Sequence, residues 1–249
     1  MNEAVLLAEV LLEKLGMYQK PELATIASRI GLIVREKPLE GCDGVLVRVQ
    51  SQMKGGVIIR STIPEKTKKR FTLAHEIGHY LLPSHSFREV ACTGKQINCW
   101  IGDRVEREAD SFAAELLLPS TLRKRFQFIP SFVKIGAIAE EFGTGFITTI
   151  RRHIDLTDLM CAMIYSVNGR AKYFHISKRF PYRVPIKELP HPESIASHLF
   201  QKPDLYELSS EICSDYWIIK DDCQYVRLFE LSRYLRSFNA VVSLVWIQS

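Results

Sequence analysis

The sequence lacks the features that would place it in a membrane or on a secretory route. A helix needs about 20 apolar residues to cross a bilayer, but the apolar stretch over residues 4–12 is interrupted by Glu9 and followed by Glu13. Acidic Glu3, and no basic stretch, precedes that run, so no signal peptide is expected. We therefore expect a cytoplasmic protein without membrane association.

Cysteines with short paired spacing are also missing. The six cysteines are scattered, and none forms the C-x-x-C spacing of redox or zinc-ribbon motifs. Cys92 and Cys99 fall in the loop between two long predicted helices, but their spacing gives no reason to make them metal ligands. We expect reduced thiols and a fold that needs no disulfide.

A strong excess of charge of one sign is absent as well. The formal net charge is +5, with 47% hydrophobic and 24% charged residues, which is typical of a soluble globular protein and not of a disordered chain. This charge permits binding to nucleic acid or to an acidic protein and predicts neither. A length of 249 residues favours one main domain with a smaller companion.

The first part of the chain predicts helices followed by a small antiparallel sheet. Apolar residues recur at helical spacing up to Gly16, and Pro21 and Gly31 suit the two ends of a second helix. Gly55-Gly56, with the polar residues before it, is expected to supply a turn between two strands. The expected helices are residues 4–15 and 21–30, and the expected strands are 32–35, 45–49 and 57–59.

The middle of the chain is predicted to be helical. Pro64 opens a helix that ends at Leu82, because Pro83 cannot continue the hydrogen-bond ladder. After a polar loop, further helices are expected over residues 103–118, 119–126, 132–142 and 146–154. The last two form a helical hairpin that resembles a helix-turn-helix over residues 132–154.

Beyond residue 157 the pattern changes to β-rich runs. Asn168-Gly169 between two such runs predicts a hairpin, because both residues tolerate the positive φ of a type I′ turn. The expected strands are 160–167, 171–176, 216–219, 225–231 and 240–247, with a helix near 192–200. The fold class is therefore α+β, with a domain over residues 1–155 and a second α+β domain over 158–249, for which we hypothesise a sensory or regulatory role.

The pattern H-E-x-x-H lies inside the helix predicted after Pro64. At about 100° per residue, positions four apart share a helix face, so His75 and His79 can present both imidazoles to one ion. Glu76 can reach past that ion toward a water molecule and take its proton. Because apolar residues flank the motif, we expect it to be buried, where polar side chains need partners.

A catalytic zinc site needs a third protein ligand, and two candidates compete for that place. His85 has the spacing of the third metzincin histidine, but Leu82 stands where those proteins have a glycine. Glu106 is the other candidate, because it shares a helix face with Asp110, which would accept a hydrogen bond from a ligand histidine. Glu108 points to a different face.

The sequence resembles the ImmA/IrrE family of metallopeptidases. The matching segments are Arg70–His79, Glu106–Pro119 and Ile138–Gly143, and the resemblance covers roughly residues 1–155. It implies a zincin-like fold and zinc (Zn2+) held by His75, His79 and Glu106, with Glu76 as the catalytic residue. In two places the chain departs from the family pattern: Asp110 stands where asparagine is common, and Gly143-Thr144-Gly145 replaces a valine-serine turn.

The resemblance also implies a function and a partner. Characterised members cleave helix-turn-helix repressors and so release stress or mobile-element genes, which makes such a repressor the expected protein substrate. The alternative is a DNA-binding or protein-binding regulator that keeps the fold without proteolysis. Thr148, Thr149, Arg151 and Arg152 would then face nucleic acid, but arginines on a solvated helix face are the simpler interpretation, so DNA binding is not favoured.

Overall fold

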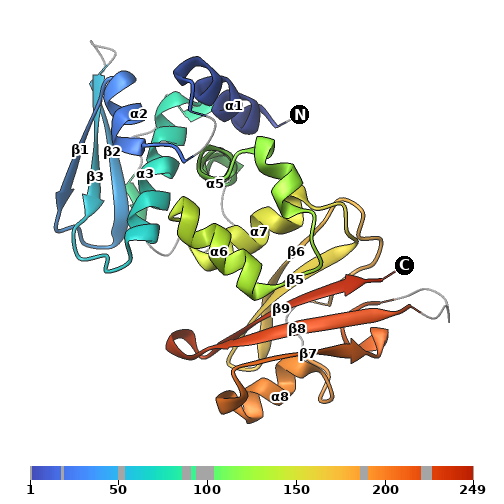
Figure 1. Cartoon of the computed structure of the whole chain (residues 1–249). Helices are drawn as coiled ribbons and strands as arrows, with labels where there is room; N and C mark the ends of the chain where they lie inside the picture. The colour runs from blue at the N-terminus through green and yellow to red at the C-terminus, as the bar shows by residue number, and fades with distance from the viewer. Residues whose placement is uncertain are drawn as a thin grey trace. The chain divides into compact units, whose positions relative to one another are not determined.

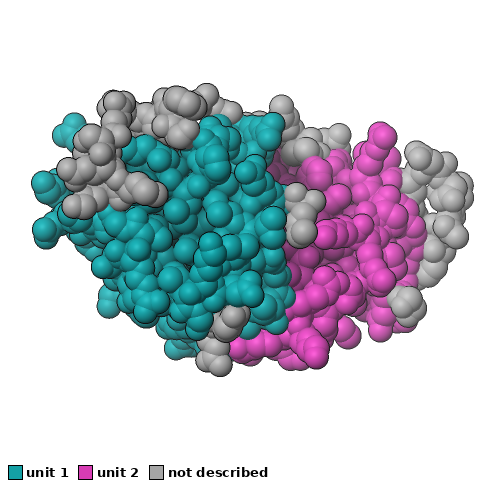
Figure 2. Space-filling model, turned by 90° about the horizontal axis from the view of Figure 1, so that it is seen from above, with its two compact units in different colours: residues 1–122, 136–149 teal, residues 123–135, 150–249 magenta. Residues whose placement is uncertain are grey.

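The computed structural model describes residues 2–17, 20–49, 54–85, 91–93, 104–185, 190–219 and 226–248. It combines helices with two sheets, which confirms the α+β class. The chain forms two compact units, Met1–Leu122 with Gly136–Thr149 and Arg123–Ile135 with Ile150–Ser249, coloured separately in Figure 2. The division into domains at residues 155–158 stays a prediction.

The helices of the first unit begin and end where the local sequence indicates. In α1 the side chain of Asn2 accepts a hydrogen bond from the backbone N–H of Ala4, and Gly16 ends the helix with a φ of 65°. Pro83 follows the end of α3 closely. The helices and 3-10 turns up to residue 126 are α1 (Glu3–Leu15), α2 (Leu23–Arg29), α3 (Lys66–Leu81), η1 (Pro83–His85), α5 (Arg104–Leu117) and η2 (Ser120–Phe126).

The first unit contains a four-stranded sheet in the order β1-β3-β2-β4. Strands β1, β3 and β2 are labelled in Figure 1. Its strands are β1 (Leu32–Lys37), β2 (Cys42–Val49), β3 (Lys54–Arg60) and β4 (Ala91–Thr93). The expectation of a purely antiparallel sheet is wrong for one pair, since β1 runs parallel to β3. The reason is that the β2–β3 hairpin turns back toward β1, so that β3 lies between β1 and β2.

The predicted turn at Gly55-Gly56 is also wrong, because both glycines lie within β3. A Cβ on Gly55 would come within 2.9 Å of the Leu32 side chain and of the Val47 carbonyl oxygen. Glycine is therefore present at this position because neighbouring strands approach closely, and not because the chain turns there.

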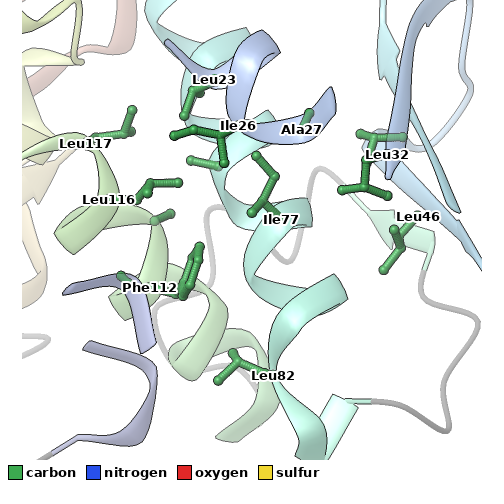
Figure 3. Close-up of a cluster of buried hydrophobic side chains, with 14 of the residues drawn as sticks. Leu23, Ile26, Ala27, Leu32, Leu46, Ile77, Leu82, Phe112, Leu116 and Leu117 are labelled. Carbon is green, nitrogen blue, oxygen red and sulfur yellow. The ribbon is translucent and has the colours of Figure 1, made fainter. Parts of the chain in front are cut away.

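The hydrophobic core of the first unit lies between its helices and its sheet. Figure 3 shows side chains of α2, α3, α5 and the strands converging, among them Ile26, Ile77, Phe112 and Leu116. A Cβ on Gly78 would lie 3.1 Å from Phe112 Cδ1, so the absence of a side chain lets α5 approach α3. This close packing places the motif helix against the helix that carries Glu106.

Two helices follow, α6 (Phe132–Phe142) and α7 (Phe146–Leu156), as the periodicity predicted. Gly143, between them, has a φ of 61°, a conformation that favours glycine. Within the turn the Thr149 hydroxyl lies 3.0 Å from the Gly145 carbonyl oxygen and 2.8 Å from the Thr144 hydroxyl. The hydroxyl of Thr149 is therefore used to hold the turn.

The second unit contains an antiparallel sheet in the order β6-β5-β9-β8-β7, with α8 packed against it (Figure 1). The predicted type I′ hairpin is confirmed, since Asn168 and Gly169 have φ values of 50° and 74°. The elements are β5 (Cys161–Val167), β6 (Arg170–Ile176), α8 (Ile195–Gln201), η3 (Pro203–Leu205), β7 (Glu207–Ile212), η4 (Ser214–Tyr216), β8 (Leu228–Leu235), η5 (Arg236–Phe238) and β9 (Ala240–Ile247).

The strand predicted over residues 216–219 is wrong. Ser214–Tyr216 form a 3-10 turn, and Ile219 makes only an isolated bridge with Arg183. The aromatic residues that suggested a strand include Trp217, which is buried and donates its indole N–H to Glu230. The sheet instead uses β7, whose polar sequence Glu-Leu-Ser-Ser-Glu-Ile gave no strand signal, because β7 lies at a sheet edge and needs no apolar alternation. None of the helices in the described part of the chain is long and apolar enough to cross a membrane.

Candidate metal centre

Helix α3 carries His75, Glu76 and His79 into the interior of the first unit. All three side chains are buried, with relative exposures of 1%, 0% and 0%. His75 and His79 lie one turn apart, and their Nε2 atoms are 2.9 Å from each other. The shared helix face predicted from their spacing therefore brings the two imidazoles together.

Helix α5 supplies a carboxylate to the same point. One oxygen of Glu106, Oε2, lies 3.2 Å from His75 Nε2, and the other, Oε1, lies 3.6 Å from His79 Nε2. One ligand atom from each of the three residues can be chosen so that all lie within 4.8 Å of one another. The structure thus brings together the three residues that the sequence singled out as metal ligands.

This group of atoms fits a divalent cation. Tetrahedral coordination with bonds of about 2.0–2.1 Å places neighbouring ligand atoms about 3.3 Å apart. The separations of 2.9, 3.2 and 3.6 Å lie on both sides of that value. Two imidazole lone pairs and a carboxylate repel each other in a buried space unless a positive charge lies between them.

The protonation states of His79 and Glu106 also favour binding of a cation. Burial lowers the pKa of His79, which favours the neutral imidazole with a free lone pair. Burial alone would raise the pKa of Glu106, but the adjacent imidazoles of His75 and His79 outweigh this effect and hold the pKa below its ordinary value. The carboxylate is therefore ionised, and the residues of this site could bind a metal.

Asp110 lies on the outer side of His75. Its Oδ1 is 3.0 Å from His75 Nδ1, the ring nitrogen that points away from Glu106. A hydrogen bond donated by Nδ1 leaves the lone pair on Nε2, where a metal would need it. Asp110 therefore contacts the far nitrogen of a candidate ligand histidine, as the sequence predicted.

His85, the other predicted candidate for third ligand, lies on the opposite side of His79 from Glu106. Its Nδ1 is 2.9 Å from His79 Nδ1, whereas Glu106 approaches His79 Nε2. The second nitrogen of His85, Nε2, lies 3.2 Å from Glu108 Oε2. His85 therefore contacts a proposed ligand and does not join the group of ligand atoms.

Glu76 points toward strand β2 at Gly44. A Cβ added at Gly44 would lie 2.6 Å from Glu76 Oε1 and 2.7 Å from Thr72 Cγ2. Glycine at this position therefore makes room for the carboxylate. Sequence reasoning missed Gly44, because nothing in the local pattern of β2 indicates which residue of α3 it faces.

Three consecutive basic residues of α3, Lys68, Lys69 and Arg70, precede the motif, and each has a structural partner. Lys68 lies 2.9 Å from the buried carboxylate of Asp43, and Lys69 lies 2.6 Å from Glu36. Arg70 donates a hydrogen bond to the carbonyl oxygen of Pro21. These contacts hold α3 against the rest of the first unit.

Two further sets of residues were considered from the sequence, the candidates for contact with nucleic acid and two cysteines. Thr149 and Arg152 are buried, so two of the residues considered for contact with nucleic acid are not on the surface. Cys99 lies outside the described residues, as does the side chain of Cys92.

Comparisons with known proteins support the sequence interpretation. The model of the Peptidase_M78 family, described as an IrrE N-terminal-like domain, matches residues 27–152, just over half of the 249 residues. No curated protein matches the chain.

A solved structure titled "Mycobacterium tuberculosis transcriptional regulator" has a similar fold, with a TM-score of 0.62 and 13% sequence identity over 99% of this chain and 76% of that chain. The family match covers the segment that holds His75, His79 and Glu106. The chain therefore belongs to the Peptidase_M78 family, which confirms its resemblance to the ImmA/IrrE metallopeptidases.

Proposed function

We propose that this protein is a zinc-dependent endopeptidase in which His75, His79 and Glu106 hold the metal and Glu76 is the catalytic base. The observation that carries the proposal is the convergence of two imidazoles and a carboxylate beside a buried glutamate, in a chain that belongs to a peptidase family. A cytoplasmic location is part of the proposal.

The chain's own residues would divide the work of peptide hydrolysis. Zinc, when bound, supplies a Lewis acid that polarises the scissile carbonyl and makes water easier to deprotonate. Glu76 removes the proton from the attacking water and later delivers it to the leaving amine nitrogen. Asp110 holds His75 in the tautomer that keeps the lone pair on Nε2. Gly44 leaves room for the carboxylate of Glu76.

We propose a helix-turn-helix repressor as the substrate. This part rests on the family, whose characterised members cleave such repressors and release stress or mobile-element genes. The first protein to test is a helix-turn-helix repressor encoded next to the gene for this chain.

The decisive experiment compares Glu76→Gln with the wild-type protein. The variant should keep its zinc, because Glu76 is not a ligand, and should cleave the repressor about 10²–10⁴-fold more slowly, because the general base is lost. Glu230→Gln, a matched change of a buried carboxylate in the second unit, should leave the cleavage rate unchanged. Normal cleavage by Glu76→Gln would show that the assigned base is wrong.

A second candidate is a regulator that binds DNA or protein and does not cleave. It is suggested by the similar solved structure, which is titled a transcriptional regulator. That function predicts binding to duplex DNA that weakens steeply as salt screens the phosphates, and purified protein without metal. Endopeptidase function predicts stoichiometric zinc and a cleaved repressor.

A further inference from the structure

Two ligand histidines of the proposed metal site are supported in different ways. His75 Nδ1 faces a carboxylate directly, since Asp110 Oδ1 lies 3.0 Å away. His79 Nδ1 faces a second histidine, with His85 Nδ1 at 2.9 Å, and the carboxylate of Glu108 lies beyond it, 3.2 Å from His85 Nε2. The three groups Glu108, His85 and His79 thus form one continuous chain of hydrogen bonds that leads to the metal group.

We propose that His85 is a positioning residue for His79, oriented by Glu108, and that this relay fixes the tautomer in which His79 binds the metal. The proposal rests on the proposed function, because it needs His79 to act as a ligand. It adds a role for His85 and Glu108 that neither the motif nor the family match assigns.

The direction of each hydrogen bond follows from the chemistry of the groups. A carboxylate can only accept, so His85 Nε2 must be the donor to Glu108. A neutral imidazole carries a single N–H, so His85 Nδ1 has a lone pair and must accept from His79 Nδ1. The only proton of a neutral His79 is then on Nδ1, which leaves the Nε2 lone pair facing Glu106 and His75.

The carboxylate at the end of the relay is held in place. Arg104 Nε lies 2.7 Å from Glu108 Oε1, one helical turn away on α5, and the Ser84 hydroxyl lies 3.2 Å from Glu108 Oε2. These donors favour the ionised, accepting form of Glu108. At the inner end, both imidazoles are buried, so the N–H of His79 would lack a partner if His85 could not accept.

The test compares two substitutions of nearly equal size. In His85→Asn the amide oxygen takes the place of Nδ1 and can still accept from His79, whereas His85→Leu puts a methyl group there. Zinc affinity, measured by competition with a chelator, should fall about 10–100-fold in His85→Leu, as expected for loss of a group that supports a ligand. His85→Asn should recover most of that loss. His153→Leu, which removes a buried histidine of the second unit, should bind zinc as the wild-type protein does.

A second measurement needs no variant. In zinc-loaded wild-type protein labelled with ¹⁵N at histidine, a scalar coupling across the hydrogen bond should connect His79 Nδ1 and His85 Nδ1. Absence of this coupling, or equal zinc affinity in His85→Leu and the wild type, would overturn the relay. Wild-type protein that binds no zinc would instead refute the proposed function itself, so the two failures are distinguishable.

Discussion

Each unit contains a buried carboxylate with several hydrogen-bonding partners, and the partners differ in kind. Glu230 of the second unit accepts bonds from the backbone N–H groups of Ile195 and Ala196, the indole of Trp217 and the hydroxyl of Ser232, at 2.6–3.1 Å. Glu106 of the first unit faces the lone-pair nitrogens of two imidazoles. Donors satisfy Glu230 from within the protein, whereas the group around Glu106 is a set of electron-pair donors that could hold a cation.

The two units also contain buried histidines in different settings. His79 is surrounded by His75, His85 and Glu106. His153 stacks on the ring of Phe128, with ring centroids 4.6 Å apart and an angle of 21° between the rings. Burial of a titratable side chain therefore does not by itself indicate a site. The chemistry of its partners separates a candidate metal ligand from a residue of the core.

Substitution of the two carboxylates should change zinc binding to very different extents. Glu106→Ala removes a proposed ligand, so zinc affinity should fall by more than the ~10–100-fold expected for a supporting group such as His85. Glu230→Gln should leave zinc affinity unchanged, because its partners are donors in the other unit. The measurement is the zinc affinity and zinc content of Glu106→Ala, Glu230→Gln and His85→Ala. Loss of zinc in His85→Ala alone would show that the third ligand was wrongly chosen.

A smaller effect, on cleavage rate and stability, is expected from a substitution at Gly44, because the first unit has no room there for another carbon. Gly44→Ala would push on Glu76 Oε1 and Thr72 Cγ2, so we expect the carboxylate to move and cleavage to slow while zinc stays bound. Overpacking of this kind costs about 1–3 kcal/mol of stability. Gly136→Ala is the control, because a Cβ there meets nothing within 4 Å. Urea denaturation and repressor cleavage would test both variants, and full activity in Gly44→Ala would contradict the predicted crowding.

The smallest effect concerns His153 and the dependence of stability on pH. Burial lowers the pKa of His153 to about 4, from 6.5 in its ordinary state. Between these values the unfolded chain binds a proton that the folded protein does not, so stability falls as the pH falls through this window. His153→Leu should remove about 1 kcal/mol of the stability change between pH 7 and about pH 5.5. The measurement is urea denaturation at both pH values, and identical pH dependence in the two proteins would contradict a neutral buried His153.

Local patterns predicted much of the fold because they act over a few residues. The ends of α1 and α3 follow from Gly16 and Pro83, and the hairpin at Asn168 follows from the φ values that a type I′ turn needs. The strand β7 was missed, since its residues alternate little and its place at a sheet edge is set by pairing with β8. The parallel pairing of β1 with β3 also depends on how distant segments meet.

The proximity of His75 and His79 could be predicted from the sequence, because the period of one helix places residues four apart on one face. The sequence also indicated Glu106 and Asp110, which share a face of α5. The folded structure was needed to show that Glu106 reaches both imidazoles while His85 lies behind His79, and that Gly44 faces Glu76. Contacts between separate elements depend on how helices and strands pack, and packing is set by the whole core and by no single segment.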